Sequence, residues 1–172
     1  MKAAFLAVVA ACFAMATPAL AQSQTSTDTV YETVSTTDMN TILQGMGFQS
    51  VAQVGGANTF EVHTTNGFVF NLFLVACDGP GNSCYGIEMS TSWDMEASQA
   101  TLMANTAASF NGHYSLLKAF TEPNHLRVQR YVITDGGVTA EHLRQEVRVF
   151  LSGTRFFTEY VKQQTNLQFP AP

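Results

Sequence analysis

The sequence predicts an α+β fold in which an antiparallel sheet of about five or six strands carries helices on one face. Three observations predict it. A long apolar run, residues 68–93, is interrupted by a short turn between two cysteines. Further short runs alternate between apolar and polar residues and are separated by turns rich in Gly and Asn. Three other segments carry apolar residues at helical spacing, so the expected order is α-β-β-β-β-α-β-β-α.

Residues 68–76 are the expected centre of the sheet. Both alternating sets of side chains in this segment are largely apolar, which is typical of a strand that is covered on both faces. The segment 78–83, Asp-Gly-Pro-Gly-Asn-Ser, consists of turn formers, and alternation resumes at Tyr85. We therefore expect a hairpin with Cys77 and Cys84 at its mouth.

These two cysteines favour a structural disulfide. Cysteines that face each other across the last pair of a hairpin can come within bonding distance. Closing so short a loop stabilises by about 2–3 kcal/mol in the chain-entropy model. The alternatives are a redox dithiol, which usually has Cys-x-x-Cys spacing, and a zinc site, which needs further ligands at recognisable spacing. Neither pattern occurs in the sequence, so the Cys77–Cys84 disulfide is preferred.

The first 21 residues have the composition of a secretory signal peptide. Lys2 supplies the positive charge, residues 3–15 are apolar, and Ala19-Leu20-Ala21 is a small-x-small cleavage site. The sequence therefore predicts cleavage after Ala21 and a periplasmic or secreted protein, in a compartment where disulfides persist. Lipid attachment at Cys12 is the less favoured alternative, because cleavage there leaves too short an apolar segment. No later apolar run is long enough for stable membrane insertion.

About 150 residues remain after cleavage, which is enough for one domain with a sizeable core. Residues 22–37 are rich in Ser, Thr and Gln and predict a flexible lead-in. Residues 38–163 hold all the predicted elements, and 164–172 form a short proline-containing tail. The chain is therefore expected to be a signal peptide, a lead-in, a single domain and a tail.

The predicted helices differ in length. The first, residues 38–46, follows a Thr36-Thr37 cap and ends at a glycine. The second covers 97–110, and the longest begins near Thr139, with Gly153 as a potential point of bending or splitting. The strands beside the central one are expected at 50–54, 59–63, 85–92, 116–121 and 126–133.

Charged residues are sparse, 12% of the chain, and unevenly placed. Residues 22–117 contain eight acids and no Lys or Arg, whereas 118–172 contain seven bases and five acids. The two parts thus carry about minus eight and plus two (seven minus five) charges. The acidic part argues against nucleic acid or an anionic membrane as its partner. Opposite charge favours attraction between the parts, within one fold or across a homodimer.

The order of these features resembles the YbjN-domain family, a bacterial group to which a role in sensory transduction has been ascribed. The motifs that carry the resemblance are the hairpin cysteines, Asn105, Phe110-Asn111, Lys118-Ala119-Phe120, residues 126–133, Gly136-Gly137-Val138-Thr139 and Phe150. The match covers roughly residues 37–161. Phe110 departs from the Trp expected before Asn, and Lys118 departs from the common Arg, which weakens any bidentate contact there. The resemblance implies a type III secretion chaperone-like fold and a dimer-forming binding module, not a catalyst.

Candidate catalytic and metal-binding residues are few. The four histidines, His63, His113, His125 and His142, lack metal-ligand spacing, and ordinary surface or capping roles are preferred. The carboxylate pairs Asp94/Glu96 and Glu61/Glu88 are better explained by solvated surfaces and a helix N-terminus. Motifs for a nucleophilic serine or a phosphate-binding loop are absent from the sequence. We therefore predict no catalytic, metal or cofactor residues; the alternative is a small hydrolytic enzyme built on Asp94, Glu96 and His113.

Two surfaces of the last helix are predicted to bind a partner. The basic stripe comprises Arg144, Arg148, Arg155 and Lys162, which fall on one side at 100° per residue. It is either a solvated face, partly neutralised by an Arg155–Glu159 pair, or a docking surface for an acidic partner or the acid-rich part of a second subunit. In the second case, reversing Arg148 and Arg155 to Glu weakens association.

The second surface is aromatic. Phe156 and Tyr160 lie on the helix flank away from its core-facing stripe, and they either widen the buried face or line a dimer or client groove. The preferred function is accordingly a non-enzymatic, homodimeric, chaperone-like or regulatory binding module. A periplasmic ligand or metal sensor that acts on a partner protein is the alternative.

Overall fold

The structure is a computed structural model that describes residues 29–80 and 82–172. The predicted signal peptide, its cleavage site after Ala21, Cys12 and the first part of the lead-in lie outside the described residues. No helix in the described ranges is both long and apolar enough to cross a membrane.

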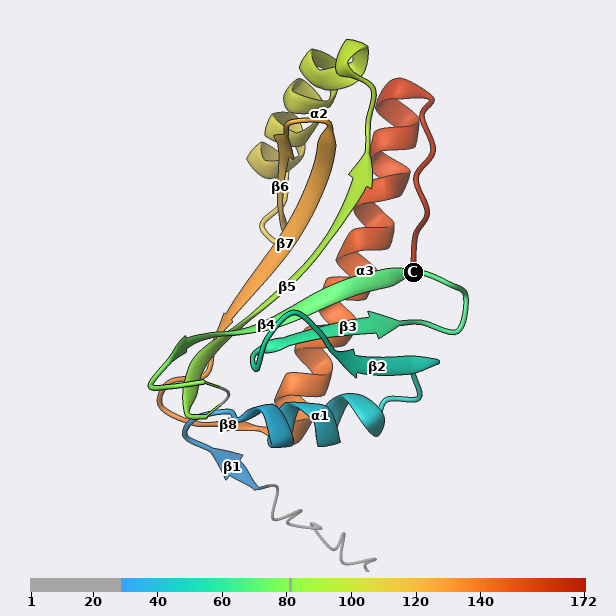
Figure 1. Ribbon diagram of the computed structural model, residues 1–172. Helices are drawn as coiled ribbons and strands as arrows, with labels where there is room; N and C mark the ends of the chain where they lie inside the picture. Colours follow the sequence, from blue (N-terminus) through green and yellow to red (C-terminus); the bar gives the residue numbers. More distant parts are fainter. Residues whose placement is uncertain (1–28, 81) are drawn as a thin grey trace, which may run out of the picture.

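A six-stranded antiparallel sheet with the order β2-β3-β4-β5-β7-β6 forms one layer of the molecule (Figure 1). Its strands are β2 (Ser50–Gln53), β3 (Thr59–His63), β4 (Val69–Cys77), β5 (Cys84–Asp94), β6 (Lys118–Glu122) and β7 (His125–Ile133). A separate two-stranded sheet pairs β1 (Val30–Tyr31) with β8 (Val138–Thr139). The predicted α+β class, the four-strand meander and the central place of β4 are confirmed.

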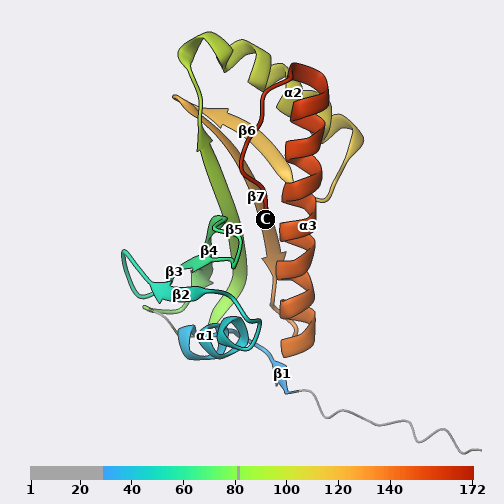
Figure 2. The same ribbon diagram turned by 90° about the vertical axis from the view of Figure 1, so that its right-hand side faces the viewer.

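Helices form the second layer. They are α1 (Thr36–Gln44), the short 3₁₀ turn η1 (Ala97–Gln99), α2 (Ala100–His113) and α3 (Ala140–Thr165). Figure 2 shows α3 running along one side of the sheet, with α2 beside its C-terminal half. All three α-helices contribute buried apolar side chains to one core cluster with the inner face of the sheet.

The core is built from aromatic rings that link these layers. Phe70 of β4 packs on Phe150 of α3 with ring centroids 5.4 Å apart. Phe157 of α3 meets Phe110 of α2 at 4.9 Å and Trp93 of β5 at 6.1 Å. Two sets of ring contacts therefore join the sheet to α3, and the second set also includes α2.

The expectation that the central strand is covered on both faces is wrong for its outer face. Phe70, Leu72 and Leu74 of β4 are buried, whereas the alternate residues 69, 71, 73 and 75 are only partly buried. The helices pack on the inner face, so outer apolar side chains are screened mainly by neighbours on the adjacent strands. An apolar run on both faces of a strand does not by itself specify two covering layers.

Ordered structure begins earlier than the predicted lead-in allows. Val30 and Tyr31 pair with β8, and Val34 is fully buried and bridged to Cys84. The helix cap is also one residue earlier than predicted: Ser35, not Thr36 or Thr37, caps α1 and forms a capping box with Asp38. The few apolar residues of the lead-in thus fix the start of the domain instead of leaving it flexible.

Two further predictions concern the hairpin cysteines and the glycine within the last helix. Cys77 and Cys84 are register partners with their Cα atoms 3.9 Å apart, and the predicted disulfide is confirmed. α3 runs unbroken through Gly153, so this residue is not a point of breakage. Instead, a Cβ atom at position 153 would lie 3.0 Å from Cγ of Leu117. The glycine therefore allows the Leu117 side chain to pack closely against the helix.

Candidate binding surfaces on the last helix

The structure places most of the basic stripe in contacts within the chain. Nη1 of Arg148 and Nη1 of Arg144 lie 2.8 and 3.3 Å from the carboxylate of Glu141 in the first turn of α3. Arg155 donates two hydrogen bonds, of 2.8 and 2.6 Å, to the carbonyl oxygen of Pro172. Arg155 therefore binds the C-terminal tail and not Glu159, the partner predicted at helical spacing.

Two arginines of the stripe therefore share one acidic residue, Glu141. The hydrogen bond from Arg148, followed by that from Arg144, lowers the pKa of Glu141 below its usual value of 4.5. The carboxylate is nevertheless exposed, so solvent and salt screen the interaction. Lys162, the fourth member of the stripe, is exposed in the last turn of α3. Three of the four basic side chains of the stripe thus have a partner within the chain, although Glu141 balances only one of their positive charges.

The aromatic flank of α3 is different, because it continues onto α2. Phe156 packs edge-on against Tyr114 with centroids 4.8 Å apart, and Tyr160 meets Phe110 at 5.5 Å and Tyr114 at 6.0 Å. Tyr160 also shares a 2.8 Å hydrogen bond with the hydroxyl of Ser109. We call Phe110, Tyr114, Phe156 and Tyr160 the aromatic surface.

Two of its rings remain accessible to solvent. Tyr114 is 36% exposed and Phe156 is 41% exposed, while Phe110 beneath them is fully buried. Leu102 of α2, 46% exposed, lines a cavity of about 200 Å³ together with Tyr160. Large apolar side chains on α2 and α3 therefore face solvent around the buried ring of Phe110.

Tyr114 was not predicted as part of this surface, because the second helix was expected to end at residue 110. The helix passes through Gly112 and ends at His113, which carries Tyr114 to the edge of α3. The tertiary contacts with Phe110 and Phe156 outweigh the weak helix propensity of Asn and Gly.

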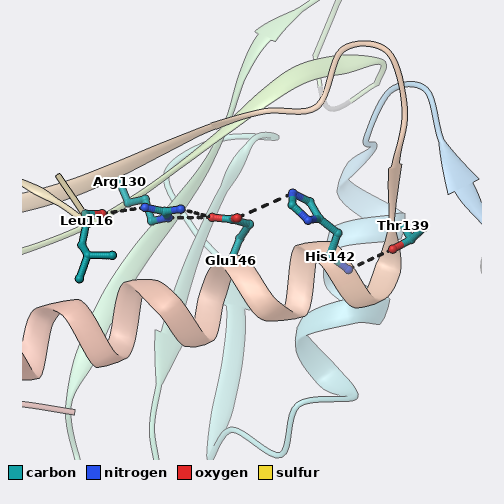
Figure 3. A network of polar contacts seen from close by, with 5 residues as sticks. All are labelled: Leu116, Arg130, Thr139, His142 and Glu146. Atoms are coloured by element: carbon teal, nitrogen blue, oxygen red, sulfur yellow. Dashed lines mark hydrogen bonds and ion pairs between the residues drawn. The ribbon is translucent and has the colours of Figure 1, made fainter.

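A polar network at the other half of α3 was also missed (Figure 3). Nε and Nη2 of Arg130 lie 2.7 and 2.6 Å from Oε2 of Glu146, and Nη1 donates a 2.7 Å hydrogen bond to the Leu116 carbonyl. His142 lies 3.7 Å from the other oxygen of Glu146, and Thr139 caps the helix by accepting from the His142 amide. The network ties α3 to β7 and to the segment that follows Tyr114.

The alternation of apolar residues along β7 could have predicted this network. Leu126, Val128 and Val132 of β7 are buried, and Arg130 occupies the same alternate set. A single arginine among inward-facing apolar residues requires a carboxylate partner on the covering element. Glu146, which is 14% exposed, supplies it.

The structure does not assemble the residues of the alternative enzymatic site. Asp94 lies 3.1 Å from His125, Glu96 caps η1, and His113 contacts the carbonyl of Ser109 at 2.8 Å. Five cavities among residues 29–80 and 82–172 are lined by other side chains. Within those same ranges, no cluster of three or more His, Cys, Asp or Glu side chains could hold a metal ion.

The second carboxylate pair is likewise divided between separate partners. Glu61 and Glu88 lie on the same outer face of the sheet, with β4 between their strands. Glu61 pairs with His63 at 2.8 Å, and Glu88 lies 3.7 Å from Arg127. The Arg127–Glu88 contact joins the basic and acidic parts of the chain within one fold.

The antiparallel sheet and the layer of helices on one of its faces define an α+β fold that can be compared with solved structures. The crystal structure of YbjN, a proposed transcription regulator from E. coli, shares this fold with a TM-score of 0.61 and 17% identity. The match covers 83% of this chain and 100% of YbjN. The fold is therefore YbjN-like, as the sequence resemblance predicted.

A weaker structural match has a TM-score of 0.48 and 12% identity. It is an uncharacterized protein from Methanothermobacter thermautotrophicus, and it covers 76% of this chain and 99% of that one. No protein-family model matches the sequence. No curated protein matches it either.

Proposed function

We propose that this chain is an exported, non-enzymatic binding module of the YbjN type that forms a homodimer through the aromatic surface. The exposed rings of Tyr114 and Phe156 above the buried Phe110 carry the proposal. Aromatic side chains are enriched in the cores of protein interfaces, where they supply large contact areas with little loss of conformational entropy. A chaperone-like or regulatory role follows if the dimer presents its remaining surfaces to a protein partner.

The contrast with the basic stripe supports this choice of surface. The carboxylate of Glu141 already binds Arg144 and Arg148, so a partner there must compete with contacts inside the chain. The rings of the aromatic surface lose only water when they are covered, which is favourable in proportion to the apolar area removed. Export is supported by the signal-peptide composition of residues 1–21 and by the Cys77–Cys84 disulfide.

The native mass of the mature protein, measured by light scattering, tests the proposal. We expect a dimer for the wild type and a monomer for Phe156→Glu, because the substitution places a charge in the centre of the apolar contact. Ile133→Glu is the matched control, since Ile133 is 66% exposed on the outer face of the sheet, away from the aromatic surface. Circular dichroism confirms that both variants are folded. A monomeric wild type, or a Phe156→Glu variant that remains dimeric, contradicts the proposal.

A further inference from the structure

The outer face of the sheet carries a tyrosine ring that lies across a neighbouring strand. The helices pack on the inner face, so outward-pointing side chains of β5 and β7 have no covering layer among the described residues (Figure 2). Tyr131 of β7 is one of these side chains, and its register partner on β5 is Glu88. It is 50% exposed, more than either open ring of the aromatic surface.

Gly86 of β5 allows this ring to lie on the sheet. A Cβ atom at position 86 would lie 2.5 Å from the hydroxyl oxygen of Tyr131 and 2.9 Å from its Cζ atom. The ring therefore occupies the space above the β5 backbone into which any other residue would direct its side chain. One face of the ring is covered by the backbone and the other is open, in agreement with its half exposure.

A cavity of about 250 Å³ adjoins Tyr131 at the edge of β7. It forms because β6 begins only at Lys118, opposite Gln129, while β7 continues past this position. The segment before Lys118 is held away from the line of β6, since the Leu116 carbonyl accepts a hydrogen bond from Arg130 (Figure 3). The hollow is thus fixed by a contact of the polar network described above.

Three polar side chains line the cavity and remain available for a ligand. Those of Ser115, Lys118 and Gln129 form no hydrogen bond or ion pair within the described parts of the chain. Nζ of Lys118 lies 5.5 Å from the centre of the Phe120 ring, a contact that leaves its three N–H donors free. A hydroxyl, an amide and an ammonium group therefore offer both donors and acceptors beside the open ring.

The charges around Tyr131 balance each other. On one side, Arg127 is shared by Glu88 at 3.7 Å and Glu122 at 3.5 Å, which leaves one negative charge in excess. Lys118 supplies one positive charge on the other side. A charged ligand would meet a like charge at one end, whereas a neutral ligand with many hydroxyl groups can donate to the carboxylate and accept from the ammonium.

A saccharide combines these properties with a surface that fits the ring. When the hydroxyl groups of a sugar are equatorial, as in glucose, both faces of the sugar carry only C–H groups. Such a face packs well on an aromatic ring, because the ring face is negative and the C–H hydrogens are slightly positive. The hydroxyl groups then point outward, toward polar side chains at the border of the ring.

We propose that Tyr131, Gln129 and Lys118 form a binding site for a neutral saccharide of glucose-like configuration. One sugar unit packs on the open face of Tyr131, and the next places its hydroxyl groups against Gln129 and Lys118. The cavity is smaller than the roughly 300–1,000 Å³ of sites for drug-sized ligands, so it accommodates a single sugar unit. The site shares no residue with the aromatic surface and does not depend on a homodimer.

Calorimetry and NMR titration of the mature chain test the proposal with two neutral trisaccharides, cellotriose and chitotriose. The glucuronic acid analogue of cellotriose is the matched charged probe, because it keeps the ring configuration and adds a carboxylate to each unit. We expect the wild type to bind at least one neutral trisaccharide. The charged analogue should bind at least about tenfold more weakly than cellotriose, since its carboxylates meet the excess negative charge beside Tyr131.

Two substitutions test the ring directly. Tyr131→Ala removes the packing face and should weaken binding of the neutral trisaccharide at least about tenfold. Gly86→Ala should weaken it similarly without removing any group that contacts the ligand, because the added methyl group displaces the ring. Tyr131→Phe keeps the ring and should bind like the wild type. Phe156→Glu, on the aromatic surface, should also leave saccharide binding unchanged.

Three results would overturn the proposal. The first is that neither neutral trisaccharide binds the wild type, and the second is equal affinity for cellotriose and its charged analogue. The third is wild-type affinity in a Tyr131→Ala variant that is folded by circular dichroism; this variant decides the role of the ring if Gly86→Ala does not fold. The native mass of Tyr131→Ala keeps the test apart from that of the dimer, because this substitution should abolish saccharide binding and leave the mass unchanged.

Discussion

The basic stripe and the aromatic surface lie on two flanks of the same helix, yet they differ in what the rest of the chain supplies to them. Glu141 binds both Arg144 and Arg148, and the tail binds Arg155. α2 instead extends the aromatic flank, where Phe110 and Tyr114 add rings to Phe156 and Tyr160. Helical spacing identifies both flanks equally well. Their difference shows that tertiary partners decide whether a helix face remains available for binding.

A related contrast separates the two halves of α3 itself. The first half is joined to the sheet by the Arg130–Glu146 pair in addition to Phe150, whereas the second half is joined by Phe157 and its ring neighbours. Ring packing depends on shape and tolerates truncation poorly. A partly buried ion pair also costs desolvation, so replacing both partners together is far less damaging than removing one.

The largest expected effect is that of Phe157→Ala. Phe157 is fully buried and contacts both Phe110 and Trp93, so truncation leaves a cavity where the sheet, α2 and α3 meet. We expect a loss of about 3–5 kcal/mol in the free energy of unfolding, measured by urea denaturation. Phe156→Ala is the matched control, because the adjacent ring is 41% exposed and should cost clearly less. Equal losses would mean that the second half of α3 is not packed as described.

A smaller effect is expected for the Arg130–Glu146 pair. Arg130→Met leaves the carboxylate of Glu146, 14% exposed, without its main partner, and should lower the free energy of unfolding by about 1–3 kcal/mol. Adding Glu146→Leu should recover most of this loss, because both charges are then removed from a partly buried site. Urea denaturation of the two single variants and the double variant measures the coupling. Strictly additive losses would show that the pair contributes no interaction energy.

The sequence predicted both flanks of the last helix but not the residues that contact each flank. Periodicity placed Phe156 and Tyr160 on one flank and the four basic residues on another, and alternation located the central strands and the hairpin disulfide. The contacts Arg155–Pro172 and Tyr114–Phe156 join residues whose proximity depends on where the tail and α2 run. Local patterns do not encode that information. Arg130 is the exception, since its apolar neighbours on β7 already indicated a buried charge that needs a carboxylate.

The smallest expected effect, and the one most specific to the basic stripe, is the pH dependence of the stability that Glu141 contributes. Its pKa is lowered by hydrogen bonds from Arg148 and Arg144, so the unfolded chain binds this proton more readily than the folded chain. The stabilisation is therefore fully present above the ordinary pKa of 4.5 and is lost as the pH falls through the lower folded value. Glu141→Gln should melt at a lower temperature than the wild type at pH 7, and the difference should vanish in acid.

Thermal melts of Glu141→Gln and the wild type between pH 7 and pH 3, at low and high salt, measure this difference. Glu159→Gln provides the control, because Glu159 is an exposed glutamate of the same helix without an ion pair among the described residues. High salt should reduce the effect of Glu141→Gln at pH 7, since the contact is exposed to solvent. A melting difference that persists unchanged below the folded pKa would show that Glu141 acts through packing or helix capping. Arg144 and Arg148 would then have no strong partner within the chain, and the basic stripe would be as available for docking as the aromatic surface.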